Sequence, residues 1–139
     1  MKRLIFLSAG LIILNAPAYA LTLSCTLHSE YDRRHFVGRI NQSTIDIFSP
    51  KKQIHVLNLD DKTAVYKGPE FKTKLGILTN KRIEWEYVVT YNNKEKTNEH
   101  VVTHKYMYLR KKKKIIATVD FGTAYMQIVS RRSYCKETQ

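Results

Sequence analysis

The sequence predicts an all-β domain: a small antiparallel meander of about eight strands that closes, or nearly closes, into a barrel. Apolar and polar residues alternate with a period of two along most of the chain, which is typical of half-buried strands. Gly, Pro, Asn and Asp separate short runs of β-branched and aromatic residues. Two cysteines lie far apart, so a disulfide would link the N- and C-terminal strands. A β-sandwich is the alternative architecture.

The alternation is clearest at the start of the domain, where Leu21, Leu23, Cys25 and Leu27 share one face. Further strands are expected at 45–48, 54–59, 63–66, 75–78, 83–91, 101–109, 115–119 and 123–129. The one candidate helix covers 29–36, where a serine could cap the first turn. A loop is the alternative for that segment.

The segments 83–91 and 101–109 predict one long hairpin, for which two registers are open. The first places Trp85 opposite Tyr106 and Glu86 opposite Lys105. A shift by one residue aligns Ile83 with Met107 instead and inverts the faces. The first register is favoured because it pairs aromatic rings and opposite charges across the strands.

The last strand contains a conflict of parity. Ala124, Met126 and Ile128 share one face, whereas Cys135 falls on the other. If Cys135 bonds to an inward-facing Cys25, we expect a bulge or the end of a strand near residues 131–133.

The first 20 residues have the three parts of a cleavable signal peptide. Lys2 and Arg3 precede an apolar run at 4–14, and the triplet 18–20 carries small residues at both ends. This run is about half the ~20 residues that a spanning helix needs, so no transmembrane segment is expected after cleavage. We therefore expect a single β domain at 21–139, exported to the periplasm, with secretion as the alternative.

Both of these compartments are oxidising, which decides the state of the cysteines. Cys25 and Cys135 are the two cysteines of the chain, and both lie in the domain that remains after cleavage. We expect them to form a disulfide bond. Closing so long a loop stabilises the fold by about 4–5 kcal/mol on the chain-entropy model. The spacing does not support a Cys-x-x-Cys redox pair.

The domain is strongly basic, since loss of the signal lowers the formal net charge only from +12 to +10. Half of that charge lies in one run at an expected hairpin tip, formed by Arg110, Lys111, Lys112, Lys113 and Lys114. This run is either a solvated turn that discourages aggregation or a polyanion-binding patch. Four more cations could extend it: Lys51, Lys52, Arg131 and Arg132.

Aromatic residues gather in the long hairpin, and Trp85, Tyr87, Tyr106 and Tyr108 form a candidate aromatic patch. Such rings can stack on nucleic-acid bases or on sugars. They are also the residues that pack across strands, which is the favoured interpretation. A nucleic-acid partner is disfavoured because an exported protein rarely meets one.

No metal site or catalytic motif is recognised. His100 and His104 lie four residues apart, about 13 Å along a strand, which is too far to chelate one ion. A nucleophile elbow, a carboxylate pair, a phosphate-binding glycine loop and a zinc-protease helix are all missing from the sequence. We therefore expect no catalytic residue, no cofactor and no bound metal.

Three hypotheses of function follow. The first is a non-enzymatic binding or accessory protein whose basic turn engages an anionic envelope component or an acidic protein. The second is a lipocalin-like carrier with a small apolar ligand between faces such as Leu23/Leu27 and Ile83/Trp85/Val89, which requires a hollow interior. The third is a hydrolase of unknown type, which requires a histidine and a carboxylate within hydrogen-bond reach in a cleft. The oligomeric state is open.

Overall fold

A computed structural model describes residues 20–28, 31–35, 46–92, 99–122 and 127–138. Within these ranges the chain forms nine strands: β1 (Ala20–Thr26), β2 (Tyr31–His35), β3 (Lys52–Asn58), β4 (Thr63–Lys67), β5 (Phe71–Leu78), β6 (Arg82–Asn92), β7 (Glu99–Leu109), β8 (Lys114–Asp120) and β9 (Gln127–Thr138). The described residues contain no helix that is long and apolar enough to cross a membrane. The expected signal peptide falls almost entirely outside the described residues and stays a prediction.

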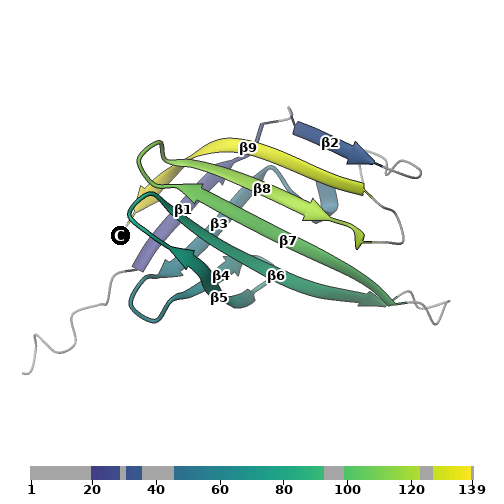
Figure 1. Cartoon of the computed structure of the whole chain (residues 1–139), viewed down its shortest axis with the longest axis horizontal. Helices are drawn as coiled ribbons and strands as arrows, with labels where there is room; N and C mark the ends of the chain where they lie inside the picture. Colours follow the sequence, from purple (N-terminus) through teal and green to yellow (C-terminus); the bar gives the residue numbers. More distant parts are fainter. Residues whose placement is uncertain (1–19, 29–30, 36–45, 93–98, 123–126, 139) are drawn as a thin grey trace, which may run out of the picture.

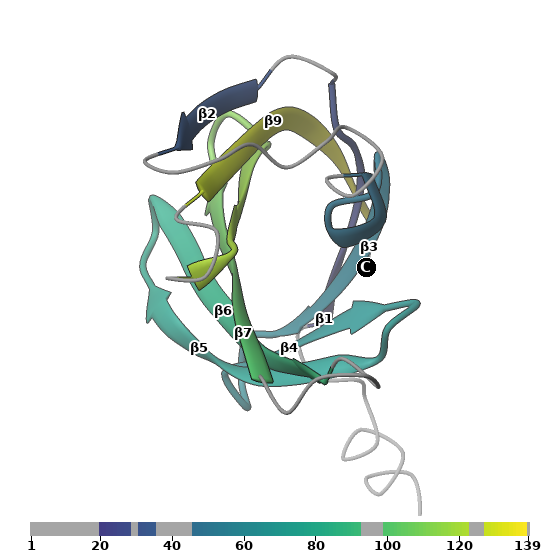
Figure 2. The same cartoon turned by 90° about the vertical axis from the view of Figure 1, so that its right-hand side faces the viewer.

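Eight of the nine strands close into an antiparallel barrel. Each of β3 to β8 pairs with the next strand along the chain, and β1 completes the circle by pairing with both β3 and β9. Figure 2 shows the resulting ring of strands. The prediction of an all-β meander is confirmed and the β-sandwich is wrong. Closure leaves few free edges, because each of these eight strands has two neighbours.

The segment expected as a helix at 29–36 contains strand β2 instead. Tyr31–His35 pairs antiparallel with the first half of β9, from Arg131 to Gln127. An isolated helix of this length is marginal in water. The free edge of β9 satisfies the same backbone groups with ladder hydrogen bonds, so the partner strand decides the conformation.

The strand expected at 45–48 is also wrong, because residues 46–48 form a helical turn beside β3 (Figure 2). Two contacts favour this conformation. The Asp46 carboxylate accepts a hydrogen bond from the Arg131 guanidinium, and the Phe48 ring packs edge-on against Phe121 with ring centroids 5.2 Å apart. Both partners lie far away in the sequence, which is why the local pattern misleads.

The long hairpin has the register favoured from the sequence. Trp85 pairs with Tyr106, Glu86 with Lys105 and Tyr87 with His104, so the alternative that aligns Ile83 with Met107 is wrong. The aromatic rings therefore point to one side of both strands, into the barrel.

Strand β9 has no bulge between Ile128 and Cys135. Its register with β8 advances one residue at a time from Lys114↔Tyr134 to Asp120↔Ile128, so the expected irregularity is wrong. The residues that point inward are Val129, Arg131, Ser133 and Cys135. An arginine in this position is tolerated because Asp46 and the Ser49 carbonyl oxygen accept hydrogen bonds from its guanidinium.

Buried side chains in the barrel interior form two clusters, a large one and a smaller one of Val102, Val119, Phe121 and Val129. The completely buried residues of the large cluster are Leu23, Leu57, Ala64, Ile83, Tyr108 and Ile115. The faces named for an apolar ligand belong to this core, since Leu23, Leu27, Ile83 and Trp85 pack in one buried cluster. Any ligand space must therefore lie elsewhere.

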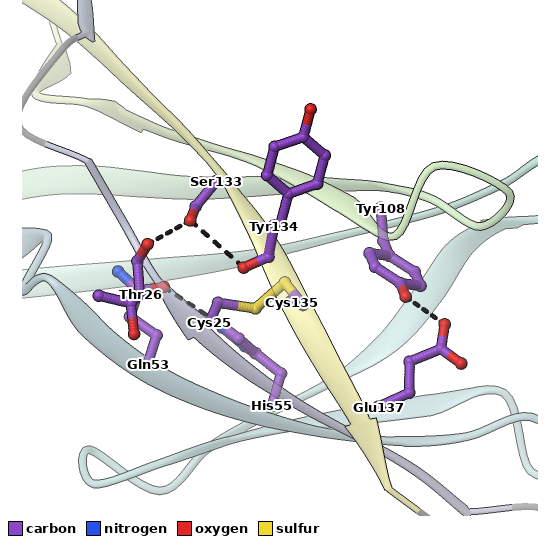
Figure 3. The surroundings of a disulfide bond; sticks show 9 residues. All are labelled: Cys25, Thr26, Gln53, His55, Tyr108, Ser133, Tyr134, Cys135 and Glu137. Atoms are coloured by element: carbon purple, nitrogen blue, oxygen red, sulfur yellow. Dashed lines mark hydrogen bonds between the residues drawn. A yellow bond between two sulfur atoms is a disulfide. The ribbon is translucent and has the colours of Figure 1, made fainter.

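The predicted disulfide joins Cys25 of β1 to Cys135 of β9, which are direct partners across the two strands (Figure 3). Two hydrogen bonds flank it. The Ser133 hydroxyl donates to the Thr26 carbonyl oxygen, and the Tyr108 hydroxyl donates to the Glu137 carboxylate. This part of the barrel seam is therefore closed by a covalent bond and by side-chain contacts.

Candidate functional site

The run of five cations lies at a hairpin tip, as predicted. Leu109 pairs with Lys114, and the four residues between them form the β7–β8 turn. Lys111, Lys112 and Lys113 are exposed. The turn lies on the left in Figure 1, beside the end of β9 and near the β5–β6 turn.

The β5–β6 turn adds two cations that the sequence analysis missed. The Arg110 backbone N–H donates to the Lys81 carbonyl oxygen over 3.0 Å, and the Arg110 guanidinium donates to the Thr79 carbonyl oxygen over 3.0 Å. Arg82 stands opposite Leu109 in the ladder. The predicted hairpin register could have revealed these two cations, because it places residue 82 next to the β7–β8 turn.

Together these residues form a basic cluster, consisting of Lys81, Arg82, Arg110, Lys111, Lys112, Lys113 and Lys114. Among the described residues, Arg82 forms an ion pair with Glu84 over 3.3 Å. Tyr134 of β9 pairs with Lys114, and its ring is 66% exposed and points away from the barrel (Figure 3). The cluster therefore combines many cations with one exposed aromatic ring.

The four cations that could have extended the run lie elsewhere. Lys51 and Lys52 stand at the start of β3, and strands β9 and β1 separate β3 from β8. Arg131 is completely buried inside the barrel. Arg132 lies on the outer face of β9, opposite Ile116.

The four residues of the candidate aromatic patch lie inside the barrel. Trp85, Tyr87, Tyr106 and Tyr108 are each at most 4% exposed. The Trp85 and Tyr106 rings stack with centroids 5.4 Å apart, and the Tyr87 ring meets Tyr106 edge-on. Burial, and then the Glu137 carboxylate, raise the pKa of Tyr108. The geometry of these rings is that of cross-strand packing.

At the centre of these rings lies His55, which the sequence analysis did not single out. Its ring centroid lies 4.4 Å from Tyr106 and 4.5 Å from Tyr66. Its Nε2 lies 3.0 Å from the Gln53 side-chain oxygen, while the Gln53 amide donates to the Pro50 carbonyl oxygen. Burial lowers the pKa of His55 to about 3, so the ring is neutral at pH 7.

A pocket of about 470 Å³ opens at the other end of β5 from the basic cluster. Its wall comes from residues 47–52, from the β4–β5 turn with its flanking residues, and from His104 of β7. Phe71 and Lys67 are the strand residues on either side of that turn. No local pattern could have predicted this pocket, since its three parts are separated in the sequence.

His104 lies in the wall of this pocket and is 2% exposed. Neither of its ring nitrogens has a hydrogen-bond partner among the described residues. Burial lowers the pKa of His104 to about 4. The ring therefore presents one donor and one acceptor in the neutral form.

The described residues do not assemble a recognised catalytic or metal centre. They contain no group of three His, Cys, Asp or Glu side chains that could hold a metal ion. In the same part of the chain, His55 bonds to an amide, and no carboxylate is hydrogen-bonded to His104.

The fold and site define a class of protein: an eight-stranded antiparallel barrel, closed by a disulfide, with a basic cluster at its turns and a pocket at the other end of β5. No protein family, curated protein or solved structure matches the chain.

Proposed function

We propose that the protein is a non-enzymatic binding protein, exported to the periplasm, that docks on anionic lipid headgroups of the cell envelope through the basic cluster. The observation that supports this best is the convergence of two turns. The β7–β8 turn and the first residue of β8 carry five consecutive cations, which meet Lys81 and Arg82 at the β5–β6 turn. One described carboxylate, Glu84, is ion-paired within this group.

The electrostatic attraction is large enough to bring the protein to a membrane. Each Lys or Arg near an anionic membrane surface contributes about 1 kcal/mol. The four lysines 111–114 would contribute about 4 kcal/mol by this rule, a factor of roughly 1000 in partitioning. The hydrogen bonds from Arg110 to the neighbouring turn hold the backbone in place, so little ordering is needed on binding.

The exposed Tyr134 favours a lipid surface over an acidic protein. Tyrosine is enriched at membrane interfaces, where its ring lies at the level of the headgroups and its hydroxyl stays in water. Tyr134 pairs with Lys114, so the ring and the cations can meet the same surface. An acidic protein would need the cations but not the ring.

Co-sedimentation with vesicles tests the proposal. The purified protein is expected to bind vesicles of phosphatidylglycerol and phosphatidylcholine at about 0.1 M salt and to leave them at about 1 M, where the Debye length falls to about 3 Å. Replacing Lys111, Lys112, Lys113 and Lys114 by Gln should lower partitioning about 1000-fold. The matched control replaces Lys51, Lys52, Lys67 and Lys72 by Gln, with the same loss of charge, and should retain most of the binding.

Three outcomes would contradict the proposal. Equal losses in the two quadruple variants would mean that net charge alone drives binding. Binding that survives high salt would exclude the electrostatic mechanism. Binding to immobilised polyglutamate but not to vesicles would indicate an acidic protein partner. Tyr134→Ser adds a finer test, because it should weaken vesicle binding roughly fivefold and leave polyglutamate binding unchanged.

A further inference from the structure

We infer that the pocket at the other end of β5 is a second binding site, for a small amphipathic carboxylate. Its apolar body would fill the pocket, its carboxylate would pair with Lys52 and Lys67, and its buried end would carry a hydrogen-bonding group for His104. This site is separate from the basic cluster. Phe71 in the pocket and Leu78 beside the β5–β6 turn are seven residues apart, about 23 Å along the strand.

The size and surface of the pocket fit a small molecule. Its volume of about 470 Å³ lies within the range of ligand sites, roughly 300–1,000 Å³. Ile47, Phe48, Pro69 and Phe71 supply apolar walls. Ile47 is 76% exposed at the edge, so a ligand that covers it removes apolar surface from water.

The charge at the rim selects an anion. Lys52 and Lys67 both line the pocket and both are exposed. Lys67 pairs with Ile54 in the β3–β4 ladder. Lys52 lies two residues before Ile54 on β3, so it is the diagonal neighbour of Lys67, at roughly 7–8 Å between backbones. Two long, flexible ammonium side chains at this separation can reach one carboxylate. The described residues of the wall include no acid.

His104 is the reason that the ligand needs a hydrogen-bonding group at its buried end. Its ring lies 6.0 Å from that of Phe71, centroid to centroid, with both nitrogens buried and without a partner among the described residues. A buried polar atom without a partner is destabilising, and a ligand hydroxyl that donates to one nitrogen or accepts from the other removes that cost. An amphipathic acid with a hydroxyl at its far end satisfies the three features together.

Isothermal titration with three probes of equal chain length tests the inference: ω-hydroxydecanoate, decanoate and decanol. We expect saturable binding of ω-hydroxydecanoate with one site per chain. Decanoate should bind roughly five- to tenfold more weakly because it leaves His104 without a partner. Replacing both Lys52 and Lys67 by Gln should weaken the two acids about tenfold and leave decanol unchanged.

Substitution of exposed residues keeps the test independent of folding. Ile47→Asp should weaken the acids at least about tenfold, because it removes apolar wall and adds a repelling charge. Val88→Asp is the matched control, since Val88 is 62% exposed on β6 and does not line the pocket.

A substitution at the buried end tests the hydrogen bond to the ligand. His104→Phe should abolish the preference for the hydroxyl group while decanoate still binds.

Several results would overturn the inference: no binding of any probe, equal effects of Ile47→Asp and Val88→Asp, or equal affinity for ω-hydroxydecanoate and decanol. Retention of the hydroxyl preference in His104→Phe would exclude the contact at the buried end. The Gln variant of lysines 111–114 separates this site from membrane docking, because it should leave the affinity for decanoate unchanged. Failure of either proposal therefore leaves the other one standing.

Discussion

Strand β9 is attached to the rest of the barrel in two different ways along its length. Its second half, with Cys135, pairs with β1 and carries the disulfide to Cys25. Its first half pairs with β2. From this half the Arg131 guanidinium donates hydrogen bonds to the Asp46 carboxylate and to the Ser49 carbonyl oxygen. One half of this seam is covalent and the other is ionic.

The two halves differ in what can disturb them. A disulfide acts mainly by restricting the unfolded chain, so pH and salt have little effect on it. A buried arginine is stable only while its acceptors stay in place. The ionic half lies toward the pocket, where His104 has no protein partner among the described residues. Departures from complete packing and pairing of this kind are expected where a protein binds something.

The largest expected effect comes from removing the covalent half. Replacing Cys25 and Cys135 together by Ala should lower the free energy of unfolding by about 4–5 kcal/mol, measured with urea at pH 7.5. Reduction of the unaltered protein should give a similar value. A loss below about 1 kcal/mol would mean that β9 is held by its ladder and side chains, and the contrast between the two halves would disappear.

The next effect is acid sensitivity of the interior toward the pocket. Unfolded histidine has a pKa near 6.5, whereas burial lowers the pKa of His55 to about 3 and that of His104 to about 4. As the pH falls below 6.5 the unfolded chain binds protons that the folded chain does not, so stability is lost. The loss continues to about pH 4 for His104 and to about pH 3 for His55.

Each imidazole contributes about 1.4 kcal/mol per pH unit in this window, which amounts to about 3 kcal/mol between pH 7.5 and 5.5 for the two together. Urea unfolding at both pH values measures it. His104→Phe should halve the difference, because one of the two titrating groups is gone. Equal stability at pH 7.5 and 5.5 would show that the imidazoles are not buried in neutral form.

The smallest expected loss of stability comes from changing the Asp46–Arg131 ion pair in the ionic half of the seam. Asp46→Asn should cost about 2 kcal/mol, less than for a fully buried pair, because the Asp46 side chain is 44% exposed and that of Arg131 1%. Arg131→Met should cost only about 1 kcal/mol, since it removes the buried charge and deprives the Ser49 carbonyl oxygen of a donor. If the methionine variant is the less stable of the two in urea, the seam depends on the length of the arginine and not on its charge.

Features that depend on near neighbours were predictable from the sequence. Period-two alternation located most strands, and the pairing of Trp85 with Tyr106 followed from the chemistry of the facing side chains. The disulfide followed from two cysteines and from the expectation of an oxidising compartment. The tip at residues 110–113 followed from a run of cations between two apolar strands.

Features that depend on distant partners were not predictable. The helical turn at 46–48 is held by Arg131, which lies 85 residues away from Asp46, and β2 exists because β9 offers a free edge. The parity of β9 was misjudged because an inward arginine looks like an exposed one until its acceptors are known. The pocket joins three separate stretches of chain, and none of them carries a pattern of its own.

The position of the disulfide also sets an order of events in time. Cys25 and Cys135 are separated by 110 residues, yet they face each other directly in the closed barrel. A chain that emerges at 5–20 residues per second delivers the second thiol roughly 5–20 s after the first. During this interval β1 has no β9 to pair with, and the Cys25 thiol is open to exchange with the disulfides of other molecules. Until β9 is synthesised, the chain therefore carries one reactive thiol and one unpaired strand that other molecules can reach.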